Sequence, residues 1–207
     1  AMTETDAHGN MLRTFRIDFD IEGKTSEQRA DALSLALDEV LAYAVKHKLP
    51  VAMESLDFSA KKQSMTRMSV KRRVKLSGLM YAAYQKFMTS KCARKGIELH
   101  RVNPAYTSVI GKIKYATAKG WSVHAAAAGV IARRAQGFVE KAPASVKITL
   151  GPAVKTLSIP VRNAKEGPKA GRWAEYKKRL RETLLKEVRL QSKADRLRFK
   201  NRQHCSP

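Results

Sequence analysis

Glu54 is the charged residue in this sequence whose predicted position most needs a partner. It lies in the short, mostly apolar run from Val51 to Leu56. Such a run after a helix indicates a buried central strand. A carboxylate there is costly unless it is paired, protonated or bound to a metal ion. Two interpretations stay open: Glu54 is a metal ligand, or it lies at the exposed end of the strand beside a Lys or Arg.

Asp18 and His124 are the other two candidates for catalysis. Asp18 precedes Glu54 and offers a second carboxylate, although a solvent-facing position on a hairpin strand explains it as well. His124 follows Ser122, the expected start of a helix. Because histidine titrates near neutrality, His124 is either a nitrogen ligand or general base, or a helix N-terminal residue bonded to the backbone.

The run Gly23-Lys24-Thr25 resembles the end of a phosphate-binding loop. That motif requires a glycine five residues before Gly23, and Asp18 occupies the position. The better interpretation is a helix start, because Thr25 followed by Gln28 forms a capping box.

Positive charge dominates the composition. The chain has 207 residues, 41 of them Lys or Arg against 18 acids, for a net charge of +23. This excess favours a polyanionic partner, and nucleic acid is the commonest one. No apolar run of spanning length and no signal peptide is visible, so we expect a cytoplasmic protein without a membrane partner.

The basic residues gather in three places. No acid occurs from Phe58 to Ile97, and the segment 169–203 carries 13 Lys or Arg. We expect these regions and the end of one helix to face phosphates. The candidate nucleic-acid-binding residues are Lys61, Lys62, Arg67, Lys71, Arg72, Arg73, Lys75, Arg133, Arg134, Lys177, Lys178 and Arg179.

The two cysteines, Cys92 and Cys205, form no Cys-x-x-Cys pair. Their number is too small for a zinc site built from cysteines, so we expect no zinc.

Hydrophobic periodicity and turn residues predict an α/β order of elements. A domain over 1–140 is followed by a basic, mainly helical extension over 141–207. The predicted elements are a hairpin over 2–20, helices over 25–48, 76–96 and 122–134, strands over 51–56, 97–102 and 154–161, loops over 105–120, and a basic helix over 169–203.

Three blocks of sequence within residues 1–138 resemble one protein family, the RuvC-like nucleases of TnpB/OrfB-type transposons. Glu54-Ser55-Leu56-Asp57-Phe58 resembles the family's second RuvC motif, Glu-x-Leu-x-Phe. Pro104-Ala105-Tyr106-Thr107-Ser108 resembles its Pro-x-Tyr-Thr-Ser block. Ser122-Val123-His124-Ala125-Ala126, followed by Arg133-Arg134, stands where the family has Asp-x-Asn-x-Ala.

The resemblance implies an RNase H-like mixed sheet flanked by helices. It also implies a nuclease in which carboxylates, Glu54 among them, hold Mg²⁺ or Mn²⁺ for phosphodiester hydrolysis, with DNA, RNA and a guide RNA as partners.

Three departures separate this sequence from the family pattern. The leading Asp and its strand are expected to lie outside these 207 residues, Ser122 replaces the third Asp, and the zinc ribbon after Ser108 is missing. The resemblance is thus to a divergent, zinc-free branch. A metal-dependent nuclease and a non-catalytic DNA- or RNA-binding fragment both remain open.

Overall fold

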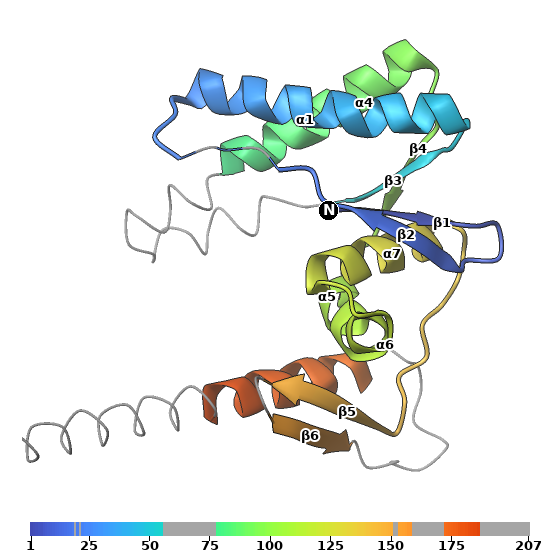
Figure 1. Cartoon of the computed structure of the whole chain (residues 1–207), viewed down its shortest axis with the longest axis vertical. Helices are drawn as coiled ribbons and strands as arrows, with labels where there is room; N and C mark the ends of the chain where they lie inside the picture. The colour runs from blue at the N-terminus through green and yellow to red at the C-terminus, as the bar shows by residue number, and fades with distance from the viewer. Residues whose placement is uncertain (19, 21, 56–77, 151–152, 159–171, 187–207) are drawn as a thin grey trace, which may run out of the picture.

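The computed structural model describes residues 1–18, 20, 22–55, 78–150, 153–158 and 172–186. They form a mixed α/β protein, as predicted (Figure 1). The described strands pair into three two-stranded sheets, whereas one mixed sheet was expected. No helix in the described ranges is both long and apolar enough to cross a bilayer.

An antiparallel hairpin opens the chain. It consists of β1 (Met2–Thr5) and β2 (Met11–Phe15), and its turn is held by the Asp6 carboxylate, which accepts from the N–H groups of His8 at 2.9 Å and Asn10 at 2.8 Å. The predicted hairpin is therefore confirmed. The second strand was predicted to reach position 20, but β2 ends at Phe15 and residues 16–18 are not in a strand; residue 19 lies outside the described residues.

A β-α-β unit follows, as the sequence predicted. Thr25 caps α1 (Ser26–His47) through the predicted capping box with Gln28. The strand β3 (Val51–Glu54) then leads, by way of α4 (Gly78–Lys95), to the parallel strand β4 (Leu99–Val102). Apolar side chains of α1, β3 and α4 form its core: Leu33, Leu37, Leu41, Met53, Met88 and Cys92.

The segment predicted as loop is helical instead. It contains α5 (Thr107–Ile110), the π-helical turn η1 (Gly111–Ala116) and α6 (Thr117–Lys119). The loop prediction treated Gly111 as a turn residue, but its role is close packing between helices. A Cβ at this position would stand 2.6 Å from the backbone nitrogen of Ala127. Glycine near a helix contact permits backbone approach as well as turns.

The helix α7 (Val123–Ala135) lies at the centre of the molecule (Figure 1). Ser122 caps it as predicted, accepting from the N–H of Ala125 at 3.2 Å. Its buried small residues, among them Ala126 and Val130, let it pack against β1, β3, β4 and η1. It therefore connects the hairpin with the β-α-β unit.

The C-terminal part adds another hairpin, β5 (Ser145–Leu150) with β6 (Ala153–Ser158), and a helix over residues 172–186. The sequence predicted β6 but missed β5. One continuous core joins this part to the rest, across the domain boundary expected at 140/141. It contains Met11, Ile110, Ile113, Val130, Ile148, Leu157, Trp173, Tyr176 and Leu180.

Candidate functional site

Glu54 ends β3 and turns its carboxylate toward the start of α5. Its Oε1 accepts a hydrogen bond from the Thr107 hydroxyl at 2.6 Å. Thr107 is almost fully buried, and the same hydroxyl lies 3.2 Å from the Pro104 carbonyl. The cost of placing a carboxylate at the end of this strand is thus met in part by a neutral hydrogen-bond donor.

The guanidinium of Arg134 lies within electrostatic reach of Glu54. Burial lowers the pKa of Arg134, and the charges of Glu54 and Glu140 oppose that effect. Arg134 also donates to the backbone carbonyls of Asn103 and Ala105, which fixes it over the loop after β4. Glu54 therefore belongs to a polar cluster that joins β3, α5 and α7.

Glu54 and His124 line the same groove. The groove has a volume of about 520 Å³ and lies between β1 and β3. Its walls are mainly apolar and include Leu37 and Val40 from α1 and Ile131 from α7. The structure thus places two of the three predicted catalytic residues along one surface.

Asp18 does not join them. Its carboxylate is 73% exposed and forms an ion pair with Arg16 at 2.6 Å. The described residues contain no group of three His, Cys, Asp or Glu side chains that could hold a metal ion. The hydroxyl of Ser122, which the sequence resemblance aligned with an Asp, accepts from the Ala125 N–H as a helix cap. The described donor set therefore does not fit a Mg²⁺ or Mn²⁺ site, and we derive no reaction step through a metal.

The predicted nucleic-acid-binding residues fall into three groups. Those from Lys61 to Lys75 lie outside the described residues. Arg133, Arg134 and Arg179 make internal contacts, and the contacts of Arg179 are with Glu175 at 3.0 Å and with the Ser158 carbonyl. Lys177 and Lys178 are exposed on the helix over 172–186. Position in the sequence could not separate the internal cations from the exposed ones.

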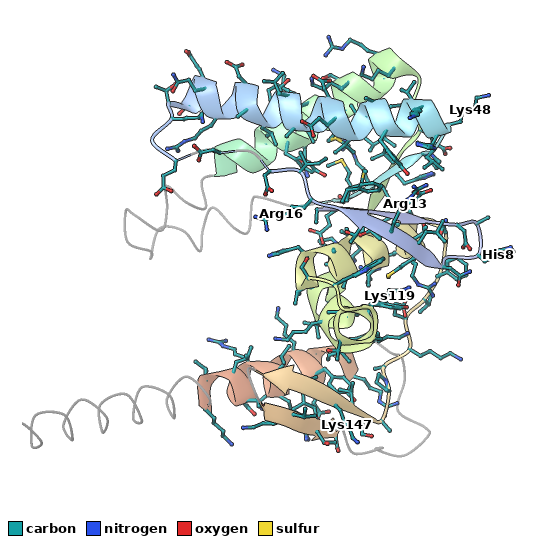
Figure 2. The ribbon with its side chains drawn as sticks, in the orientation of Figure 1. His8, Arg13, Arg16, Lys48, Lys119 and Lys147 are labelled. Carbon is teal, nitrogen blue, oxygen red and sulfur yellow. The ribbon has the colours of Figure 1, made fainter. Side chains whose placement is uncertain are left out.

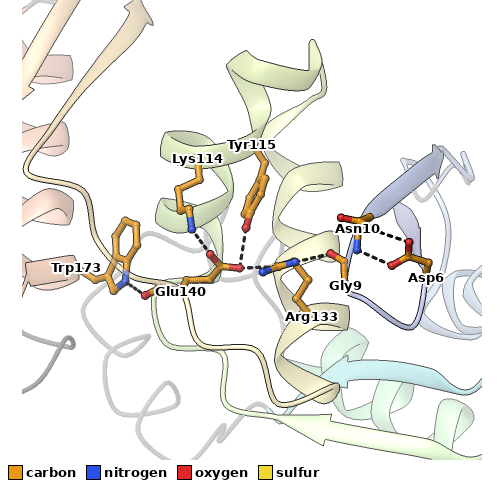
Figure 3. Close-up of polar contacts among 8 residues, drawn as sticks. All are labelled: Asp6, Gly9, Asn10, Lys114, Tyr115, Arg133, Glu140 and Trp173. Atoms are coloured by element: carbon orange, nitrogen blue, oxygen red, sulfur yellow. Dashed lines mark hydrogen bonds and ion pairs between the residues drawn. The ribbon is translucent and has the colours of Figure 1, made fainter.

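Arg133 belongs to a buried cluster around Glu140 that the sequence did not predict (Figure 3). The Glu140 carboxylate is 5% exposed and accepts from Arg133 at 2.6 Å, from Tyr115 at 2.8 Å and from Lys114. Its backbone carbonyl accepts from the Trp173 indole at 3.0 Å. The cluster therefore ties η1 and α7 to the C-terminal helix.

The charge on Glu140 reflects a balance of two effects. Burial raises the pKa of the Glu140 carboxyl, but hydrogen bonds from Lys114, Arg133 and Tyr115 outweigh it and the net pKa is lowered. Burial and the hydrogen bond to Glu140 raise the pKa of the Tyr115 phenol. The only available sequence signal was an acid shortly after the Arg133-Arg134 pair, which does not specify burial.

Comparisons of this chain with protein-family models, with curated protein sequences and with solved structures found no match.

Proposed function

We propose that this protein binds nucleic acid electrostatically and descends from RuvC-like, RNase H-fold nucleases. One observation carries the proposal: the outer face of the helix over 172–186 is basic and exposed, while its inner face is packed into the core. The exposed cations are Lys177, Lys178, Arg181 and Lys186. Trp173, Tyr176 and Leu180 anchor the opposite side.

These four cations are exposed, unlike the basic residues that the fold uses internally, although the Nζ of Lys177 also lies 5.9 Å from the centre of the Tyr106 ring. Lys91 pairs with Asp38 and Arg133 pairs with Glu140, so their charges are compensated. None of the four cations on the outer face pairs with a carboxylate in the part of the chain that the structure describes. Exposed cations that form no ion pair favour phosphate contacts, because each contact releases condensed counterions.

The proposed ancestry is supported by the order of elements and by the place of Glu54. A hairpin, a helix and a parallel pair of strands occur in the order that the resemblance implies, and Glu54 stands at the carboxyl end of β3. Fold order alone does not establish activity, so binding rather than cleavage is the proposed function.

Fluorescence anisotropy with short labelled DNA and RNA, single- and double-stranded, over a range of salt concentrations tests the proposal. We expect log Kd to rise linearly with log salt concentration, and we expect the double variant Lys177→Gln/Lys178→Gln to reduce that slope by about 1 to 2, close to 0.9 per lost phosphate contact.

The matched control is Lys46→Gln/Lys48→Gln. It removes the same charge from the end of α1, and Lys48 lies at the opposite end of the molecule from the C-terminal hairpin that bears Lys147 (Figure 2). An affinity independent of salt, or an equal loss in the two double variants, would overturn the proposal.

A further inference from the structure

Tyr106 lies between β4 and α5 in a backbone conformation that is unusual for its side chain. Its φ is 62° and its ψ is 9°, in the left-handed region. Glycine and asparagine adopt this conformation readily, whereas a bulky aromatic residue there is an outlier. Among the described residues, Lys48 is the only other non-glycine residue with positive φ, and it ends α1 as a C-cap, where that conformation is common. Tyr106 precedes a helix instead, so this explanation does not apply to it.

Contacts on both sides of Tyr106 hold this conformation in place. The Asn103 side chain accepts from the N–H of Ala105 at 2.8 Å, and Arg134 donates to the Ala105 carbonyl at 3.1 Å. Thr107, directly after Tyr106, is almost fully buried. Strained conformations persist where the surroundings over-determine them, and they cluster at active sites and ligand contacts. The strain at Tyr106 therefore directs attention to what its ring contacts.

The Tyr106 ring is anchored in the protein but not enclosed by it. Part of the ring packs against the core that includes Ile110 and Tyr176, and the residue is half-buried. The Nζ of Lys177 lies over the face of the ring, 5.9 Å from its centre. Because Lys177 is itself exposed, this face of the ring borders solvent. The fold thus presents an aromatic face beside the basic surface of the helix over 172–186.

A second aromatic residue with a nearby lysine shows what distinguishes the Tyr106 pair. The Nζ of Lys119 lies 5.2 Å from the centre of the Trp121 ring, but it also donates to the Met11 carbonyl at 3.0 Å. Lys119 is therefore held by an internal hydrogen bond. Lys177 makes no hydrogen bond and no ion pair within the part of the chain that the structure describes. It is thus available to contact a phosphate next to the ring.

We propose that the Tyr106 ring stacks on an unpaired base while Lys177 and Lys178 contact the adjoining phosphates, so that the partner is a single-stranded nucleic acid. This inference rests on the proposed function and narrows its partner class. A base within a duplex is stacked on both faces, whereas a base of a single strand is free to stack on a protein ring. A cationic surface combined with an aromatic face is the chemistry that binds single strands without requiring a particular sequence.

The test compares two labelled probes of about 15 nucleotides, oligothymidylate and an abasic oligonucleotide with the same number of phosphates. Because the probes carry equal charge, the ratio of their Kd values measures contacts to the bases. Fluorescence anisotropy on the full chain should show oligothymidylate binding about tenfold more tightly than the abasic probe. Oligouridylate, tested in parallel, distinguishes RNA from DNA as the source of the strand.

Three variants locate the base contact. Tyr106→Asn should reduce the ratio to below about twofold, because asparagine accepts the left-handed backbone but has no ring. Tyr106→Phe keeps the ring and should keep the ratio. Trp121→Leu, at the other aromatic–lysine pair, is the matched control and should also keep it. Urea unfolding verifies that each variant is folded.

The salt dependence separates failure of this inference from failure of the proposed function. Equal affinity for the two probes, with a salt slope that Lys177→Gln/Lys178→Gln still reduces, would overturn base stacking and leave electrostatic binding intact. A slope that the double variant does not change would overturn the proposed function together with the phosphate contacts inferred here. An equal loss of the ratio in Tyr106→Asn and Trp121→Leu, or a duplex that binds as tightly as oligothymidylate, would also overturn the inference.

Discussion

The Thr107 hydroxyl donates to the Glu54 carboxylate at 2.6 Å, although 53 residues separate them in the chain. The contact joins the end of β3 to the first turn of α5. Both residues lie in the blocks of sequence on which the proposed ancestry rests, but neither block predicts the contact. The bond fixes the carboxylate of Glu54, which lines the groove.

Replacing Thr107 by Val should destabilise the protein by about 1.5–3 kcal/mol. The substitution preserves shape but removes the only hydroxyl that donates to Glu54 among the described residues, and hydrogen bonds to charged groups fall in this range. Urea unfolding measures the loss. Ser108→Ala, next to it and exposed, should change the free energy of unfolding by less than about 0.5 kcal/mol. Equal effects of the two substitutions would contradict the assigned role.

Replacing Glu140 by Gln should cost about 3 kcal/mol near neutral pH, because Lys114 and Arg133 would keep their charges without the carboxylate. Since the folded-state pKa of Glu140 is lowered, its contribution is complete above the unfolded value of about 4.5 and is lost as the pH falls through the folded value.

The difference in unfolding free energy between wild type and Glu140→Gln should therefore shrink below about pH 4.5. Urea unfolding at several pH values measures it, with the exposed Glu182→Gln as control. A difference that stays constant down to acidic pH would show that the charge of Glu140 is not the stabilising feature.

Replacing Gly111 by Ala should lower stability by about 1–3 kcal/mol, because the added methyl would meet the backbone of Ala126 and Ala127 at 2.8 and 2.6 Å. Gly129→Ala is the matched comparison. The three atoms nearest to its methyl would be Cε, Sδ and Cγ of the Met11 side chain, which can shift more easily than backbone, so its effect should be smaller. Thermal unfolding by calorimetry compares them, and a larger loss at Gly129 would contradict the close approach of η1 to α7.

Replacing Glu54 by Gln should leave nucleic-acid affinity within about twofold, because the proposed contacts lie on the helix over 172–186. Incubation of wild type and variant with labelled DNA and RNA in Mg²⁺ or Mn²⁺ provides the second measurement, and we expect no cleavage that depends on Glu54. Cleavage by the wild type that disappears in the variant would demonstrate a working metal site, completed by residues outside the described ranges.

Local signals in the sequence determined most of the elements. Thr25 and Ser122 specified helix starts because a capping side chain acts within three residues. The apolar run from Val51 to Leu56 and the helix after it were enough to predict the β-α-β unit, since period and turn chemistry are local properties. The overall charge likewise follows from composition alone and supports the proposed polyanionic partner.

Tertiary structure decided what the local patterns left open. Gly111 has the same chemistry in a turn and in a packed helix, and only the approach of α7 distinguishes the two. Arg133 and Lys177 each belong to a pair of basic residues in a predicted helix, so the sequence alone does not distinguish them. Arg133 is nevertheless buried against Glu140 and Lys177 is exposed, because burial depends on contacts between distant segments. The groove between β1 and β3 also depends on tertiary structure. Residues from strands and helices that are distant in the sequence line it, so it forms only when the chain has packed, and no local sequence pattern predicts it.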